Sequence, residues 1–178
     1  MIPKNARIQQ TQFVILESSV KVHIPKDATQ IDLCKMPIEI DFDILQDHNS
    51  EPYAARVVMT IKSNNKKEVP GYAIFLKVGG EYKLSEELEV MGEDYRMLVS
   101  NSAVACLINE SRVYLQTLTA FFPFGSYIMP MIDMNNLWEQ KTSFVKDTAK
   151  EKEDDLQRKK AKTTEKKIAK QSGKLSKQ

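Results

Sequence analysis

A long amphipathic helix is the clearest feature of the hydrophobic pattern, and it lies in the stretch 101–138. Apolar or small side chains recur along it at steps of three and four residues: Val104, Leu107, Ile108, Ser111, Leu115, Leu118 and Phe122. That period predicts a helix with one face turned toward a core. Asn101 or Ser102 can cap its start, and Pro123 with Gly125 predicts its end.

The same helix carries a second, largely apolar row: Cys106, Val113, Tyr114, Thr117 and Phe121. Covering a single sheet requires only one apolar stripe. The second row is therefore expected to meet another subunit, a client protein or a membrane.

Behind the helix, residues 121–133 form a connection that is unusually apolar for a loop. Its large apolar side chains are Phe121, Phe122, Phe124, Tyr127, Ile128, Met129 and Met131. Pro123 and Pro130 exclude a regular helix here. We expect about half of these side chains to fill the core and the others to form a contact surface, because methionine and aromatic side chains adapt to varied partners.

Four segments alternate between apolar and polar residues, as half-buried strands do: 12–24, 38–45, 53–62 and 71–84. Turn-forming residues separate them, and no helical period lies between them. Consecutive strands with short links predict an antiparallel sheet. Gly79–Gly80 interrupts the fourth segment and predicts a bulge or a tight turn.

Shorter signals complete the expected architecture. Residues 26–36 are interpreted as an irregular crossing, 86–91 as a short helix, and Asp133 as the start of a second helix. We predict an α+β fold, in which a four-stranded antiparallel sheet packs against a long helix and a second C-terminal helix. The expected organisation is a flexible N-terminus (1–10), one domain (11–145) and a basic, helical or disordered tail (146–178).

Composition narrows the class of protein. Hydrophobic residues make up 42% of 178, which suits one globular domain with a tail. Cys34 and Cys106 have neither disulfide-scaffold nor zinc-site spacing. The chain begins with no signal-peptide pattern and has no apolar run long enough to span a membrane. A cytoplasmic, soluble protein that does not insert into membranes is expected.

Charge is distributed unevenly along the chain. Residues 139–178 hold 13 lysine or arginine residues against 7 acidic ones, and residues 1–138 hold 13 against 17. A body of net charge −4 therefore carries a segment of net charge +6. A basic segment can dock on acidic surfaces or RNA, or can simply be a solvated extension.

Residues that could carry catalysis are few. His23 and His48 are expected at the surface, and Cys106 lies in an apolar setting. Three acids, Glu39, Asp41 and Asp43, share one face of a strand, where no turn wraps an ion. Phosphate-loop, dinucleotide and zinc-protease motifs are missing from the sequence. We therefore expect a protein that is not an enzyme and uses no metal or cofactor.

The order of elements resembles the bacterial protein-export chaperone family SecB. The strand ending VGGEYKL is similar to that family's strand with a glycine pair, and the helix with its connection is similar to the family's helix and GxFPxxxLxPxxFDALY-type connection. Pro123 and Pro130 match its prolines, MNNLW at 134–138 replaces NFDALY, and VKVHIP at 20–25 is similar to a VSFEAP-type strand end.

The resemblance implies an ATP-independent holdase in protein export that forms a homotetramer, a dimer of dimers, and binds unfolded polypeptides in an apolar groove. On this sequence the client-binding positions would be Ile38, Ile40, Phe42, Ile44, Phe121, Phe122, Phe124, Tyr127, Ile128, Met129, Met131 and Trp138. The oligomer interface would include Val20, Val22, Val104, Leu107, Ile108, Val113 and Tyr114.

Departures from the family pattern leave alternatives open. Ser19 and His23 stand where the family has acids that dock the translocase motor SecA, and Phe75 lies near a further such position. Binding to SecA is therefore expected less strongly than binding to unfolded polypeptides. The SecB-like chaperones dedicated to an antitoxin of a toxin–antitoxin system are one alternative. The others are a nucleic-acid-binding adaptor acting through the tail, which its lack of aromatic residues disfavours, and an inert oligomeric subunit.

Overall fold

The computed structural model describes residues 7–24, 31–47, 54–64, 66, 69–84 and 99–145. The chain divides into two compact units, Met1–Met134 and Asn135–Gln178. The first unit contains the sheet, the long helix and the apolar connection. The predicted short helix at 86–91 and the tail 146–178 lie outside the described residues.

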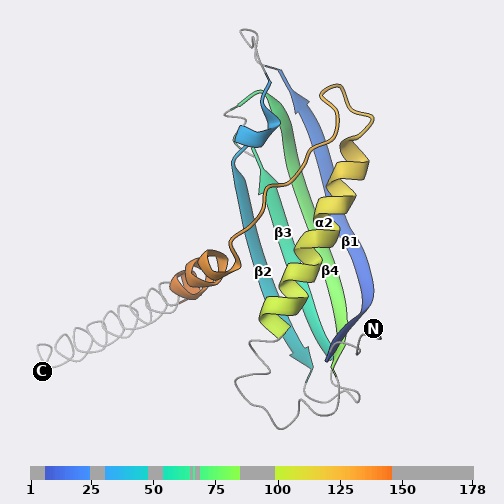
Figure 1. The fold of residues 1–178 in the computed structure, drawn as a ribbon, viewed down its shortest axis with the longest axis vertical. Coiled ribbons are helices and arrows are strands. Elements are labelled where there is room, and N and C mark those ends of the chain that lie inside the picture. Colours follow the sequence, from blue (N-terminus) through green and yellow to red (C-terminus); the bar gives the residue numbers. More distant parts are fainter. Residues whose placement is uncertain are drawn as a thin grey trace, which may run out of the picture. The chain divides into compact units, whose positions relative to one another are not determined.

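A four-stranded antiparallel sheet forms the body of the first unit (Figure 1). Its strands are β1 (Ile8–His23), β2 (Ile38–Asp47), β3 (Ala54–Ser63) and β4 (Gly71–Leu84). Their order across the sheet is β1-β4-β3-β2, so β2, β3 and β4 form a meander and β1 joins beside the last strand. The link after β1 therefore crosses the width of the sheet, and it contains the short helix η1 (Leu33–Lys35). The predicted α+β fold is confirmed.

The buried face of the sheet follows directly from the alternation in the sequence. Residues paired across antiparallel strands project from the same face. Met59 pairs with Val78 and Ile61 with Leu76, and all four are buried. Along β3 and β4 every second residue is buried, as the pattern predicted.

The helix α2 (Val104–Thr119) lies across this apolar face (Figure 1). Its buried residues are Val104, Leu107, Ile108, Ser111, Leu115 and Thr119. The predicted cap at Asn101 or Ser102 is wrong, because a π-helical turn, η3 (Val99–Ala103), precedes α2 and the N-cap Ala103 makes no side-chain cap bond. The carbonyl of Ala103 instead accepts a hydrogen bond from the buried Tyr82 hydroxyl (2.9 Å), so the helical path starts inside the core.

The glycine pair does not interrupt β4, so the predicted bulge or turn there is wrong. β4 pairs with β3 without a register shift through Gly79 and Gly80. The irregularities lie in β1, between Gln10 and Gln12 and between Ile15 and Glu17.

Strand β1 begins at Ile8, four residues before its predicted start. The polar residue Gln10 is held there by α2, since its amide nitrogen donates to the Glu110 carboxylate and its amide oxygen accepts from the Cys106 thiol (2.9 Å). A polar side chain that is fixed by a distant helix leaves no hydrophobic period in the sequence.

The second helix occupies residues 134–145, close to its predicted position. Almost all of it belongs to the second unit. Near its end Phe144 and Val145 are exposed.

Candidate polypeptide-binding surface

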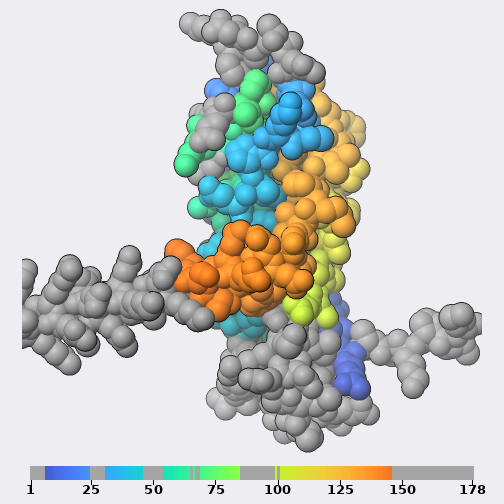
Figure 2. All heavy atoms as spheres, turned by 60° about the vertical axis from the view of Figure 1, so that its left-hand side comes forward, coloured from blue at the N-terminus to red at the C-terminus, as the bar shows by residue number. Residues whose placement is uncertain are grey.

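The apolar connection runs back alongside α2 over the sheet face, toward β2 (Figure 1). Hydrogen bonds fix this path. Tyr127 contacts Ser63 at the end of β3, and Arg112 in α2 contacts Met129 and Pro130. In Figure 2 the light orange atoms of the connection lie against the blue atoms of η1 and β2. The connection thus covers the sheet beside α2 (Figure 1).

A single hydroxyl in β4 holds the first turn of the connection. The Tyr72 hydroxyl donates to the Gly125 carbonyl (2.8 Å) and accepts from the Phe124 backbone N–H (3.0 Å). Its ring packs edge-on against Phe122 and tilted against Phe124. Burial raises the pKa of Tyr72, although the bond from Phe124 opposes the shift.

Tyr127 inserts into the core as the second anchor. Its backbone N–H donates to the Thr119 hydroxyl (2.7 Å), which in turn donates to the Leu115 carbonyl (2.7 Å). Its own hydroxyl shares a hydrogen bond with Ser63 (3.2 Å). Burial raises the pKa of Tyr127 in spite of that bond. Both Ser63 and Thr119 are fully buried, and these bonds satisfy their polar groups.

The third anchor is the guanidinium of Arg112 on the flank of α2. Its Nε donates to the Met129 carbonyl (3.1 Å) and its Nη2 to the Pro130 carbonyl (3.0 Å). Its Nη1 donates to the Asn109 side chain (2.6 Å), one helical turn earlier. The arginine therefore joins two consecutive carbonyls of the connection to α2.

Because its backbone is held at these points, the connection separates its apolar side chains into two sets. Tyr127 and Met129 are buried, whereas Ile128 between them is 62% exposed and Met131 is 88% exposed. Phe121, the first residue of the connection, is 94% exposed. The outward side of α2 adds the exposed Val113. Large apolar side chains displayed on a fixed backbone can contact other apolar groups without rearrangement of the chain.

The predicted client-binding residues fall into three groups. Phe42, Tyr127 and Met129 are buried in the core of the single chain. Half-buried residues at the edge of that core are Ile38, Ile40, Ile44, Phe122 and Phe124. The exposed members are Phe121, Ile128 and Met131. Trp138 belongs to the second unit and is not part of this surface of the first unit.

The predicted oligomer residues divide in the same way. Val104, Leu107 and Ile108 pack inside the chain. Val20 and Tyr114 are half-buried, and Val22 and Val113 are exposed.

Sequence reasoning missed the polar anchors Ser63, Tyr72, Arg112 and Thr119. One signal was present, because Thr119 continues the buried helical positions of Ser111 and Leu115 at four-residue steps. The other three bond to residues that are distant in the sequence, and no local pattern encodes such pairs.

The two edges of the sheet differ. On β2, the Asp41 carboxylate accepts a hydrogen bond from the backbone N–H of Phe42 (2.9 Å). That N–H is therefore already used and does not pair with a further strand. Among the described residues β1 has a strand on one side only. Exposed apolar side chains on β1 or just after it are Ile15, Leu16, Val22 and Ile24. Such an edge can accept another strand.

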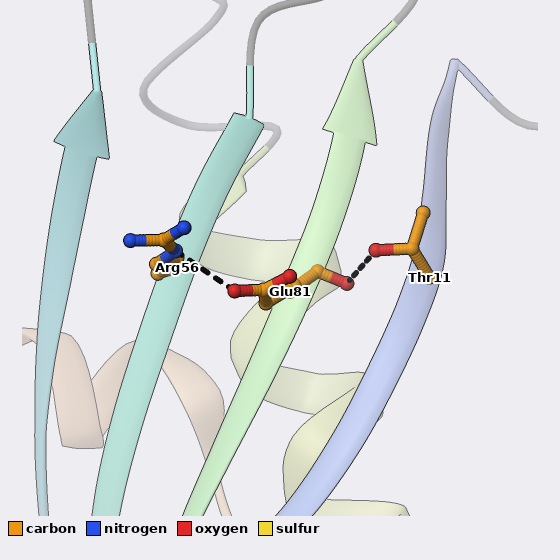
Figure 3. A network of polar contacts seen from close by, with 3 residues as sticks. All are labelled: Thr11, Arg56 and Glu81. Atoms are coloured by element: carbon orange, nitrogen blue, oxygen red, sulfur yellow. Dashed lines mark hydrogen bonds and ion pairs between the residues drawn. The ribbon is translucent and has the colours of Figure 1, made fainter. Parts of the chain in front are cut away.

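The opposite face of the sheet has a different chemistry (Figure 3). There the Arg56 guanidinium pairs with the Glu81 carboxylate (2.9 Å), and the Thr11 hydroxyl donates to the Glu81 carbonyl (3.1 Å). These groups join β3, β4 and β1. Because Arg56 and Glu81 are both substantially exposed, their ion pair adds little stability. These groups make the part of this face around Glu81 polar.

Other kinds of site find no support in the described part of the chain. No three His, Cys, Asp or Glu side chains gather there as a metal site would need. Within the same residues, no helix has the length and apolar character required to cross a membrane.

Comparison with known proteins gives distant structural likenesses. No protein-family model and no curated protein matches the chain. A solved structure of the SecB-like chaperone Rv1957 of Mycobacterium tuberculosis, in complex with a ChAD peptide from the HigA1 antitoxin, matches with 13% identity and a TM-score of 0.46, covering 71% of this chain and 91% of that one. A protein of unknown function from Streptococcus agalactiae matches with 10% identity and a TM-score of 0.42, covering 70% and 97%. These values are too low for either likeness to establish function.

Proposed function

We propose that this protein is an ATP-independent chaperone that holds non-native polypeptides on the exposed apolar side chains of the connection. The observation that carries the proposal is the outward display of Phe121, Ile128 and Met131 from a backbone held by hydrogen bonds. The SecB-like character of the element order supports the same assignment.

The magnitude of the interaction suits a holdase. Burying one large apolar side chain is worth about 1.5–3 kcal/mol. Three such side chains together give roughly 5–9 kcal/mol before the cost of association is subtracted. Binding of one site is then weak and reversible, as release of a client requires, and several sites in one oligomer would strengthen it.

The proposed oligomer is a homotetramer built as a dimer of dimers. One contact would use the edge of β1 with Val20 and Val22, since the β2 edge is partly blocked by Asp41. A second would use the outward side of α2, where Val113 is exposed and Tyr114 half-buried. These four residues are the members of the predicted interface that are not buried within the chain.

Two proposed roles, general protein export and the chaperoning of one dedicated client, differ in the polypeptides that are bound. General protein export would require delivery to SecA, and Ser19 and His23 of β1 stand where the family's acids would be. This favours a dedicated client, such as an antitoxin, over SecA-dependent export. In both roles the protein would act in the cytoplasm and bind its client through the same apolar surface.

Suppression of aggregation is the direct test. A chemically denatured client should stay soluble when diluted into the protein without nucleotide. The double variant Ile128→Asp with Met131→Asp should lose most of this activity, because a charge facing the client's apolar groups must be desolvated. Leu45→Asp is the matched control, since the 55% exposed fraction of Leu45 is close to the 62% of Ile128, but Leu45 pairs with Arg56 on the opposite face of the sheet. Equal activity of wild type and double variant would reject this surface.

A further inference from the structure

We propose that Arg112 is a positioning residue for the client surface: its guanidinium fixes the part of the connection from which Ile128 and Met131 project. This inference rests on the proposed function and assigns a specific residue to its control. The residue itself is half-buried on the flank of α2 and does not need to touch the client.

The geometry requires arginine rather than any positive charge. Nε and Nη2 lie on one edge of the planar guanidinium and donate to consecutive carbonyls, at 3.1 Å on Met129 and 3.0 Å on Pro130. The Asn109 amide oxygen accepts from Nη1 and so orients the fork from within α2. A lysine ammonium carries the charge but not this fixed two-pronged geometry.

The position of these bonds determines what they control. The Tyr72 and Thr119 bonds hold Phe124, Gly125 and Tyr127, which lie before the exposed pair. Arg112 holds Met129 and Pro130, which lie between Ile128 and Met131. Pro130 has no backbone N–H to offer a further anchor. The guanidinium therefore sets the orientation of both exposed side chains.

The test combines Arg112→Lys with the surface substitutions. Affinity for a chemically denatured client, measured by fluorescence anisotropy of the labelled client, should fall about tenfold in Arg112→Lys, because the paired charge-assisted bonds are lost. Arg56→Lys on the opposite face of the sheet is the matched control and should bind as wild type does. Thermal unfolding should show that Arg112→Lys remains folded.

A double-mutant cycle separates positioning from general structural support. In the background Ile128→Ala with Met131→Ala, Arg112→Lys should cause no further loss, since the groups it positions are absent. A full additional loss in that background, or unchanged affinity of Arg112→Lys in the wild-type background, would overturn the inference. If the wild-type protein binds no client at all, the proposed function fails instead, and the two failures are distinguishable.

Discussion

The ring of Tyr82 lies over Gly80, two residues earlier on the same strand. A Cβ atom built at Gly80 would be 2.7 Å from the Tyr82 hydroxyl oxygen. That hydroxyl is needed elsewhere, because it donates to the Ala103 carbonyl at the start of α2. Glycine at this position makes room for the tyrosine that joins β4 to the helix.

Gly80→Ala should therefore destabilise the protein by about 1–3 kcal/mol, the usual cost of overpacking a core. The measurement is the urea midpoint of unfolding, followed by circular dichroism. Gly79→Ala is the matched control: its nearest side-chain atom, on Leu16, would be 3.8 Å away, so it should change stability little. Equal destabilisation by the two substitutions would contradict this role for Gly80.

Removing the Tyr72 hydroxyl should loosen the connection. In Tyr72→Phe the ring packing against Phe122 and Phe124 remains, but the bonds to Phe124 and Gly125 are lost. We expect a loss of about 1–2 kcal/mol in the free energy of unfolding, together with faster amide hydrogen exchange at Phe124. Tyr114→Phe on α2 serves as the control and should leave this exchange rate unchanged. Unchanged exchange in Tyr72→Phe would show that its hydroxyl does not hold the turn.

Stability should decline at alkaline pH because of the buried phenols. Burial raises the pKa of Tyr82 strongly, and the negative charges of Cys106 and Glu110 raise it further; burial also raises the pKa values of Tyr72 and Tyr127. A folded-state pKa above the model value of 10.0 favours the protonated form. The stabilisation is therefore complete below pH 10 and decreases as the pH rises above it.

The urea midpoint measured between pH 8 and 11 tests this expectation. It should be steady up to about pH 9 and fall beyond about pH 10. Tyr82→Phe should be less stable at neutral pH, since the Ala103 carbonyl loses its donor, but its midpoint should fall less steeply. Parallel curves for the two proteins would exclude Tyr82 as a source of the decline.

The edge of β1 should mediate association. Val22→Lys places a charge on that edge, which opposes pairing with another strand. Light scattering should show a smaller assembly than wild type forms. Leu45→Lys on the β2 edge is the control and should leave the mass unchanged. A wild-type mass in Val22→Lys would remove β1 from the interface.

The sequence predicted those features that depend on local period. Alternation in β3 and β4 located the buried face, and the helical period located α2. The role of Gly80 could not be found this way, because it depends on where the Tyr82 ring lies in three dimensions. The start of β1 was missed for a similar reason, since Gln10 is held by α2.

The candidate surface was predicted as a segment but not residue by residue. The apolar connection was recognised from its composition and prolines. The division between buried Tyr127 and Met129 and exposed Ile128 follows a period of two, which an extended segment of this length shows only weakly. The anchors on Tyr72 and Arg112 join residues 53 and 17 positions apart, and these pairs exist only in the folded chain.

Site-specific crosslinking tests the central claim most directly. A photo-reactive amino acid placed at Met131, and in a separate variant at Leu45, is illuminated in the presence of a labelled, chemically denatured client and without nucleotide. We predict strong crosslinking from position 131, its loss when the client is allowed to fold first, and little crosslinking from position 45. Equal crosslinking from both positions, or none from position 131, would contradict the proposal that the connection holds non-native polypeptides.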